Sequence, residues 1–348
     1  MTQAISKLTI KGYKSIRNLE NFELRNLNIL IGPNGAGKSN FVSFFRLLEE
    51  ISKGEESLQR YVNYIGGADK LLFLGSKVTP VAEVSIWTDD AWSQFELKAT
   101  PVGKLEYLQQ SATETTGLNE TDRYAKLDSL QQSIYRNHKF YHFHDTSDFA
   151  GVKRPCSRRD YEYLRADASN LTAFLLRLKK KHQKEYTFIR EVIQLAVPFF
   201  DDFWFREDED KDDILLEWRE KGSDYPFHPS QISDGTLRFI CLSTALLQPN
   251  PPSTILLDEP ELGLHPYALT LLAGLIQKAS IQTQVIVSTQ SATLIDHFEP
   301  EDIVVVERQK GESIFRRLNR TDLNVWLDEY SLGDLWQRNV FGGRPSYE

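Results

Sequence analysis

The sequence has few cysteines and lacks long hydrophobic runs. Only two of its 348 residues are cysteine, Cys156 and Cys241, and they lie far apart without Cys-x-x-Cys spacing. Neither a disulfide framework nor a zinc site is therefore indicated. No apolar run approaches the roughly 20 residues of a membrane-spanning helix, and Met1 to Lys7 shows no apolar core of a signal peptide. We expect a cytoplasmic protein without membrane association.

An excess of positive charge is also missing. The formal net charge of -8 argues against a protein that coats nucleic acid through its overall field. Two local basic clusters could still contact a few phosphates: Lys153, Arg154, Arg158 and Arg159, and Arg177, Lys179, Lys180 and Lys181. Such runs are routine on solvated helix faces, so we favour that interpretation for both clusters.

The length and composition are those of a folded chain with two lobes. The hydrophobic content of 41% and the charged content of 26% are ordinary for a soluble protein. A single hydrophobic core usually stops growing at roughly 250 to 300 residues. We therefore expect more than one core.

A phosphate-binding loop is the strongest motif. The stretch Gly32 to Ser39 reads G-x-x-x-x-G-K-S, follows the apolar run Leu27 to Ile31 and precedes a helical pattern that opens at Asn40. Glycines at this spacing let backbone N–H groups surround a β-phosphate, and the helix N-terminus adds roughly half a positive charge. The motif predicts a nucleotide site in which Lys38 reaches the β- and γ-phosphates and Ser39 offers its hydroxyl to Mg²⁺. The predicted nucleotide-binding residues here are Asn34, Gly35, Gly37, Lys38, Ser39 and Asn40.

Hydrophobic periodicity predicts the first elements. Strands are expected at Ile5 to Ile10 and Leu24 to Ile31, on either side of Gly12 to Ile16, and a helix at Phe41 to Ile51 that stops near Gly54. An antiparallel meander is expected at Leu72 to Leu74, Ala82 to Trp87, Gln94 to Ala99 and Lys104 to Gln109. The polar stretch Ser111 to Lys126 is expected to be a loop.

The middle of the chain predicts a strand, helices and a hairpin. A strand is expected at Phe140 to Asp145, helices at Asn170 to Pro198, and a hairpin of Phe203 to Phe205 with Ile214 to Trp218. The acidic turn Glu207 to Asp213 in that hairpin lacks the spacing of a calcium loop.

His142 and His144 would share one face of the expected strand. A metal pair is conceivable there, but no third ligand accompanies them at a recognisable spacing. We therefore interpret His142 and His144 as two polar residues near a domain junction and not as a metal-binding pair.

A second set of polar residues complements the phosphate loop. The strand-like run Ser253 to Leu257 ends in Asp258 and Glu259, which suit a Mg²⁺ ligand and a group that activates water. Upstream, Ser233 and Gly235 precede a predicted helix and can present a hydroxyl and an N–H to an anion.

These motifs together resemble the ABC-type ATPases. Ser233 and Gly235 match that family's Leu-Ser-Gly-Gly-Gln signature, whereas Asp234 and Thr236 depart from it. Its Walker B pair falls on Asp258 and Glu259. The resemblance implies that Asp258 and Ser39 bind Mg²⁺ and that Glu259 is the catalytic base.

Two further stretches resemble the RecF, SMC and OLD branch of this family. They are the opening Leu8 to Ser15 and the Glu-Leu-Gly-Leu-His-Pro sequence from Glu261 to Pro266, which resembles the branch's D-loop. The resemblance spans nearly the whole chain. These two stretches argue against a transporter ATPase, which we rank third, behind the two functional classes given below.

One departure concerns the switch histidine. The branch usually carries Thr-His-Ser after the next strand, where this chain has Thr289, Gln290 and Ser291. Glutamine can bond water or the γ-phosphate but cannot become a cation near neutral pH, so we expect Gln290 to take part in slow hydrolysis. No Q-loop glutamine is clear, and His144 with Asp145 could replace it by position.

The expected fold is α/β, a P-loop ABC-type ATPase core with an antiparallel β meander and an inserted helical lobe. We expect the first part of the core at residues 1–150, the helical lobe and hairpin at 151–232, and the second part at 233–348. The resemblance implies a homodimer, head to tail, in which Ser233 and Gly235 of one subunit cover the γ-phosphate held by Lys38 of the other.

The resemblance leaves two functional classes open. The first is a DNA-associated ATPase of anti-phage defence or DNA repair, and the second is a nucleotide-gated scaffold that restrains an effector protein without direct DNA coupling. The C-terminal stretches Tyr330 to Trp336 and Gly342 to Pro345 resemble short bacterial RecF-like ATPases. Such proteins are often found with a separate effector, sometimes a TOPRIM-like nuclease, so an effector is the expected partner and DNA a candidate one.

Overall fold

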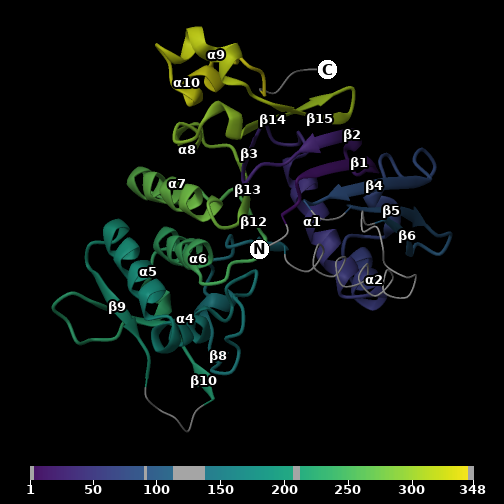
Figure 1. The fold of residues 1–348 in the computed structure, drawn as a ribbon. Coiled ribbons are helices and arrows are strands. Elements are labelled where there is room, and N and C mark those ends of the chain that lie inside the picture. The colour runs from purple at the N-terminus through teal and green to yellow at the C-terminus, as the bar shows by residue number, and fades with distance from the viewer. Residues whose placement is uncertain (1–3, 90–91, 113–137, 207–211, 344–348) are drawn as a thin grey trace, which may run out of the picture. The chain divides into compact units, whose positions relative to one another are not determined.

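The chain forms two compact units, each with its own core. The computed structural model describes residues 4–89, 92–112, 138–206 and 212–343 (Figure 1). The first unit comprises Met1–Lys139, Pro252–Leu256 and Thr283–Glu348, and the second comprises Phe140–Pro251 and Leu257–Gln282. The predicted α/β class is confirmed: the chain combines an antiparallel sheet with a second sheet rich in parallel pairs.

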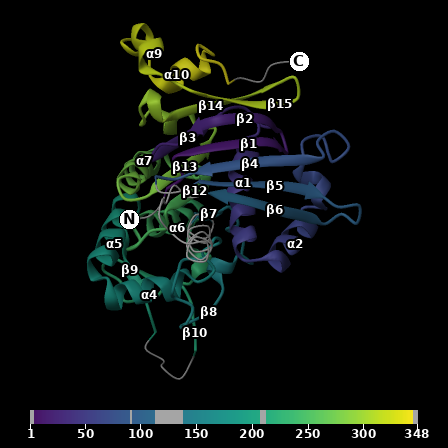
Figure 2. The same ribbon diagram turned by 45° about the vertical axis from the view of Figure 1, so that its right-hand side comes forward.

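The antiparallel sheet of the first unit has the strand order β2-β1-β4-β5-β6, which Figure 2 shows from one edge to the other. Its strands are β1 (Lys7–Tyr13), β2 (Ile16–Glu23), β4 (Val81–Trp87), β5 (Trp92–Ala99) and β6 (Leu105–Ala112). The alternation that predicts the meander is real, because Ala82, Val84 and Ile86 on β4 are all buried. Three of the four predicted meander strands are confirmed.

Leu72 to Leu74 is the exception, because Leu72 makes only an isolated bridge to Tyr13. The loop predicted from Ser111 to Lys126 is wrong at its start, because Ser111 and Ala112 belong to β6, and the rest of it lies outside the described residues.

The first hairpin corrects the prediction for residues 5–31. β1 and β2 pair through the turn at Lys14 and Ser15, and Lys14 takes a left-handed backbone with φ of 47°. β2 escapes the sequence analysis because it lies at the sheet edge and buries few side chains, among them Ile16 and Leu19.

The second sheet has the order β15-β14-β3-β13-β12-β7. Its strands are β3 (Leu27–Ile31), β7 (His138–Tyr141), β12 (Thr254–Asp258), β13 (Gln284–Thr289), β14 (Ile303–Gln309) and β15 (Glu312–Arg317). β3 pairs in parallel with β13 and β14, and every residue of β3 and β13 is buried. Continuous burial is the usual state of parallel strands covered on both faces. The boundary between the two units runs through β12 and β7.

Helix α1 (Lys38–Ser52) follows the phosphate loop and confirms the predicted helix. The observed helix begins three residues earlier than Phe41, where the apolar pattern begins. Phe41 on α1 is fully buried, and its ring lies 6.0 Å from that of Phe22, 5.6 Å from Phe45 and 5.3 Å from Phe315. This aromatic cluster holds α1 in the core of the first unit.

The first helix stops near Gly54, as expected, but a second helix begins directly after this glycine. Gly54 is the N-cap of α2 (Glu55–Tyr64), which the sequence analysis did not predict.

The second unit is mainly helical, as Figure 1 shows in teal and green. Its helices are α4 (Leu171–Lys181), α5 (Gln183–Ala196), α6 (Asp234–Leu247) and α7 (Pro266–Ser280). The helices predicted within Asn170 to Pro198 are confirmed.

The hairpin of the second unit differs from the prediction. β9 (Phe200–Trp204) pairs with β11 (Glu217–Glu220), whereas Ile214 belongs to β10 (Asp213–Ile214), which pairs with β8 (Cys156–Ser157). Most of the acidic turn from Glu207 lies outside the described residues.

The strand predicted at Phe140 to Asp145 is only partly correct, because β7 ends at Tyr141. His142 and His144 follow it, and their rings stack with centroids 4.3 Å apart. Among the described residues, no group of three or more His, Cys, Asp or Glu side chains is placed to hold a metal.

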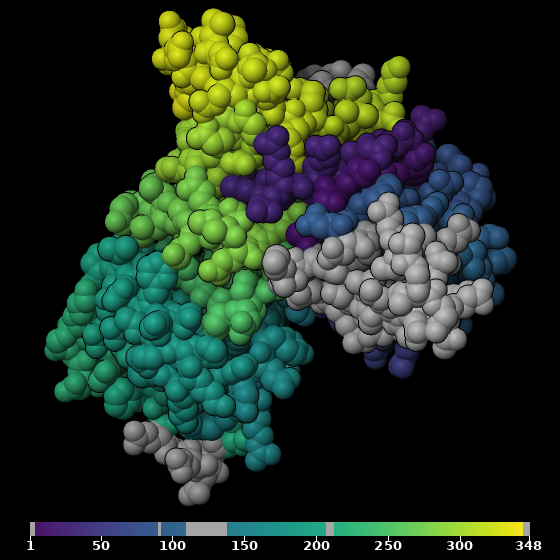
Figure 3. Space-filling model, viewed as in Figure 1, coloured from purple at the N-terminus to yellow at the C-terminus, as the bar shows by residue number. Residues whose placement is uncertain are grey.

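The first unit also contains three short helices toward the C-terminus, in the part of the described chain that Figure 3 colours from yellow-green to yellow. They are α8 (Ala292–Ile295), α9 (Arg320–Leu327) and α10 (Leu332–Gln337). The Glu307 carboxylate on β14 accepts a 2.9 Å hydrogen bond from the backbone of Gly343, which ties the last described residue to the sheet. In the described part of the chain, no helix has both the length and the apolar character to cross a membrane.

Candidate nucleotide site

The phosphate loop adopts a conformation that its glycines make possible. Gly32, Gly35 and Gly37 have φ of 152°, 80° and 111°, in the left-handed region that other residues rarely adopt. A Cβ on Gly32 would collide with the carbonyl oxygen of Val306, and one on Gly37 would collide with the hydroxyl of Ser313. The loop is therefore seated closely against β14 and β15, and only glycine fits at these two positions.

Lys38 closes the loop from inside. Its side chain is buried, and Nζ donates hydrogen bonds of 2.7 Å to the carbonyl of Gly32 and 3.1 Å to that of Pro33. The ammonium group therefore lies against the backbone at the start of the loop that the motif predicts to bind a phosphate.

A serine cluster anchors the same loop from the other side. The Ser313 hydroxyl donates a 2.6 Å hydrogen bond to the carbonyl of Ala36 and lies 2.7 Å from Oγ of Ser15. Nδ2 of Asn40 also donates to Ser15 Oγ, at 2.7 Å. Ser15 ends the stretch that resembles the RecF, SMC and OLD branch, but that resemblance gives it no role, and nothing in the sequence marks Ser313.

A pocket of about 600 Å³ opens beside this cluster. Lys14, Ser15, Asn40, Phe73 and Arg308 are among its lining residues. Nζ of Lys14 donates a 2.8 Å hydrogen bond to Ser43, and burial, aided by the nearby positive charge of Arg46, lowers the pKa of Lys14 to about 8. The pocket's volume falls in the range of small-molecule sites and could accept the base and ribose of a nucleotide.

Gln290 contacts the phosphate loop directly. It follows β13, and its Nε2 donates a 2.8 Å hydrogen bond to Oδ1 of Asn34. The structure therefore brings together two predicted site residues of the first unit.

Asp258 and Glu259 belong to the second unit, at the end of β12. Glu259 has φ of 42°, a left-handed backbone that is uncommon for a residue with a side chain. Its carbonyl accepts a 3.3 Å hydrogen bond from the backbone of Leu262, which closes a turn. A carboxylate in a strained turn is a frequent feature of functional sites.

His144 lies against this turn. Its Nε2 is 2.7 Å from the carbonyl oxygen of Asp258, and because a carbonyl only accepts, Nε2 carries the proton. Asp145 instead accepts hydrogen bonds from the hydroxyl and backbone N–H of Ser147, which lower the pKa of its carboxyl. Of the two residues considered for the missing Q-loop, only His144 has a contact with the Asp258 backbone among the hydrogen bonds described.

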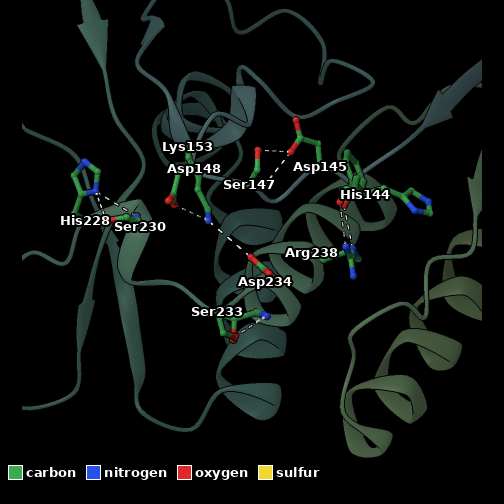
Figure 4. A network of polar contacts seen from close by, with 12 residues as sticks. His144, Asp145, Ser147, Asp148, Lys153, His228, Ser230, Ser233, Asp234 and Arg238 are labelled. Carbon is green, nitrogen blue, oxygen red and sulfur yellow. Dashed lines mark hydrogen bonds and ion pairs between the residues drawn. The ribbon is translucent and has the colours of Figure 1, made fainter.

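The segment that resembles a signature motif forms the start of α6 (Figure 4). Ser233 is the N-cap, and its Oγ accepts a 3.2 Å hydrogen bond from the backbone of Thr236. A Cβ on Gly235 would collide with the carbonyl of Gly263, so this turn is packed on the segment after Glu259. Asp234 lies 3.8 Å from Nζ of Lys153.

Comparison with known families decides the class of the protein. The family described as an AAA domain, putative AbiEii toxin, type IV TA system, matches residues 27–296. The chain belongs to this AAA family. A search among curated proteins found no match.

Solved structures show that this AAA-family protein has the fold of SMC heads. The chain is similar to the SMC head bound to the C-winged helix domain of ScpA, with 19% identity, a TM-score of 0.63 and coverage of 92% of this chain and 99% of that one. It is also similar to the Pyrococcus furiosus Smc head with an extended coiled coil, bound to the C-terminal domain of ScpA, with 18% identity, a TM-score of 0.59 and coverage of 94% and 99%. A third match is the Pyrococcus yayanosii Smc head with a coiled coil and joint, at 14% identity, a TM-score of 0.55 and coverage of 94% and 99%.

Five residues of the two basic clusters of this AAA-family protein have partners within the chain. Arg177 donates to the carbonyls of Tyr161 and Glu162, and Lys179 pairs with Asp202 at 2.9 Å. In the first cluster, Lys153 lies 3.8 Å from Asp148 and from Asp234, Arg158 donates to the carbonyl of Arg206, and Arg159 pairs with Asp212. These contacts favour a structural use of the clusters over a nucleic-acid surface.

Proposed function

We propose that this AAA-family protein binds ATP with Mg²⁺ and hydrolyses it slowly. The observation that carries the proposal is the complete phosphate loop, held between β3 and α1 with the buried Lys38 across it. Nucleotide contacts are assigned to the loop residues Asn34, Gly35, Gly37, Lys38, Ser39 and Asn40. The neighbouring pocket accepts the base and ribose.

The Mg²⁺ ligands in this proposal are Ser39 and Asp258. A hydroxyl and a carboxylate are the hard oxygen donors that Mg²⁺ prefers, and Mg²⁺ would neutralise phosphate charge. Glu259 is the base that accepts a proton from the attacking water, and Gln290 bonds the water or the γ-phosphate. Because Gln290 stays neutral, it supplies no cation, and this is the reason for slow turnover.

We further propose that ATP holds two copies together head to tail. Ser233 and Gly235 of one subunit would cover the γ-phosphate held by Lys38 of the other, since a helix N-terminus favours an anion. Hydrolysis would then release the dimer.

The biological role we favour is anti-phage defence or DNA repair together with an effector protein, with a nuclease as one candidate. The family description, which names a toxin of a type IV TA system, supports defence. SMC heads bound to ScpA domains support the use of this fold to bind a partner protein. The alternative is a nucleotide-gated scaffold, in which hydrolysis acts only as a timer and DNA has no direct effect.

ATP binding and turnover of the purified protein test the enzymatic proposal. Lys38→Ala should lose ATP binding, whereas Glu259→Gln should bind ATP, fail to hydrolyse it and accumulate as a dimer. Lys53→Ala is the matched control, because Lys53 is the C-cap residue of the same helix and pairs with Glu49 and Glu50 on its surface. Normal ATP affinity in Lys38→Ala would refute the site, and a monomeric Glu259→Gln at saturating ATP would refute the head-to-tail dimer.

Affinity capture of the Glu259→Gln protein from its host, with and without ATP, tests the partner. A stoichiometric protein partner supports a regulatory ATPase of an effector complex. DNA recovered alone, with turnover that DNA stimulates, supports a self-contained ATPase of genome maintenance. Rapid turnover without DNA or partner would contradict both roles.

A further inference from the structure

Arg238 binds three backbone carbonyls from two distant segments of the second unit. The residue is only 9% exposed. Its Nε donates a 3.0 Å hydrogen bond to the carbonyl of Phe143, Nη2 donates at 3.3 Å to that of His144, and Nη1 donates to that of Leu262. Figure 4 shows the guanidinium of Arg238 directed toward His144. A planar guanidinium with five N–H donors can serve several acceptors at once, which an ammonium cannot do in this geometry.

The two segments joined by Arg238 also meet at a second point. His144 donates from Nε2 to the carbonyl of Asp258 at 2.7 Å. The turn from Asp258 to Leu262 is therefore held at its start by the His144 side chain and at its end by Arg238. Because Arg238 also binds the His144 backbone, the two contacts support each other.

Glu259 lies within this restrained turn and needs such support. Its φ of 42° is unfavourable for a residue with a Cβ. Such strain persists where the surrounding structure determines the backbone. The bonds from His144 and Arg238 supply that restraint on both sides of Glu259.

The start of α6 presses on the same turn. Gly235 is so close to the Gly263 carbonyl that a Cβ would collide with it, and a Cβ on Gly263 would lie 2.9 Å from Nη1 of Arg238. Arg238 itself is on α6. Displacement of the α6 N-terminus would therefore move the turn that carries Glu259.

We propose that Arg238 and His144 are positioning residues. They hold the left-handed turn at Glu259 in a fixed position relative to the N-terminus of α6. Contact of Ser233 and Gly235 with a partner's nucleotide is then transmitted within the same subunit to Glu259. This inference rests on the proposed role of Glu259 as the base and of Ser233 and Gly235 in the dimer. The phosphate loop is in the first unit, and neither Arg238 nor His144 is among the residues proposed to bind the nucleotide.

The test compares steady-state ATP hydrolysis by Arg238→Lys with that by Arg177→Lys. Arg177 is the matched control, because its guanidinium also donates to two backbone carbonyls of the second unit, those of Tyr161 and Glu162. We expect Arg238→Lys to lower kcat by about tenfold or more and to leave KM within about twofold, since misplacement of a catalytic group affects the chemical step. Arg177→Lys should leave both parameters near those of the wild type.

Hydrogen exchange gives a readout besides activity. Backbone amides in 258–264 should exchange faster in Arg238→Lys than in the wild type, while those of the phosphate loop stay unchanged. His144→Ala should show the same local effect and the same loss of kcat. His144→Gln should restore part of both, because its amide can still donate to Asp258.

Each outcome has a distinct meaning. An unchanged kcat in both Arg238→Lys and His144→Ala overturns the inference, as does an equal loss in Arg177→Lys. If Arg238→Lys does not fold, the comparison of His144→Ala with His144→Gln decides in its place. If wild type and Glu259→Gln hydrolyse ATP equally, the proposed role of Glu259 fails instead. Hydrogen exchange of the backbone amides in 258–264 then tests whether Arg238 and His144 hold the turn.

Discussion

Nε2 of Gln290 donates a 2.8 Å hydrogen bond to Oδ1 of Asn34, which joins the end of β13 to the phosphate loop. The two residues are 256 positions apart in the sequence. In this arrangement a neutral amide occupies the position at which related ATPases are expected to carry a histidine. The amide can bond a phosphate oxygen, but it brings no charge to it.

Replacement of this amide tests the explanation for slow turnover. Gln290→His should hydrolyse ATP at least about threefold faster, because an imidazole can become cationic beside the γ-phosphate. Gln290→Ala can neither donate a hydrogen bond nor carry a positive charge, so it should hydrolyse ATP more slowly than the wild type. Single-turnover hydrolysis measures both variants. An unchanged rate in Gln290→His would show that Gln290 is not the cause of slow turnover.

The depressed pKa of Lys14 predicts a pH dependence of ATP binding. Lysine is cationic below its pKa, which burial lowers to about 8. Lys14 lines the pocket proposed for the base and ribose, so its charge attracts the anionic nucleotide at lower pH and this attraction is lost as pH rises. ATP affinity should therefore fall several-fold between about pH 7 and about pH 9. Isothermal titration calorimetry across this range measures it. Lys14→Arg should bind ATP with little pH dependence, since a guanidinium stays charged, and an equal pH dependence in that variant would exclude Lys14 as its source.

The ion pair between Lys153 and Asp234 predicts a charge-rescue experiment. Nζ of Lys153 lies 3.8 Å from Oδ1 of Asp234, a residue that would otherwise place an uncompensated negative charge where the partner's γ-phosphate is proposed to bind. Lys153→Met should weaken the ATP-dependent dimer, and adding Asp234→Asn should restore it.

Analytical ultracentrifugation of the Glu259→Gln background measures this rescue. Folding stability should change by no more than about 1 kcal/mol, because Asp234 is largely solvated. Additive effects of the two substitutions would show that the pair does not act as a unit.

The aromatic cluster around α1 predicts a large effect on stability. Phe41 is fully buried against the rings of Phe22, Phe45 and Phe315, so Phe41→Ala should lower the free energy of unfolding of the first unit by about 3–5 kcal/mol. Phe149→Ala is the control, because Phe149 is 78% exposed. Urea denaturation measures both. A loss below about 1 kcal/mol in Phe41→Ala would show that the site repacks around the missing ring.

The elements that the sequence predicted well have local patterns. The phosphate loop, α1 and the strands β4 to β6 depend on residues close together in the chain, whose spacing or alternation is visible without the fold. Two of the elements that were not predicted, β2 and α2, lack such a pattern. β2 buries few residues at a sheet edge, and α2 is predominantly polar with four buried residues, Ser57, Leu58, Tyr61 and Val62.

The sequence by itself determined the class of chemistry, because a phosphate loop needs its glycines, lysine and serine at fixed local spacing. Only the tertiary structure decided which distant residues support that chemistry. Ser313 reaches Ala36 across 277 positions, burial changes the pKa of Lys14, and Arg238 meets the turn that strains Glu259. Ser313 and Arg238 donate to backbone carbonyls, which are the same in every residue, so no side-chain pattern in the sequence could identify these two contacts.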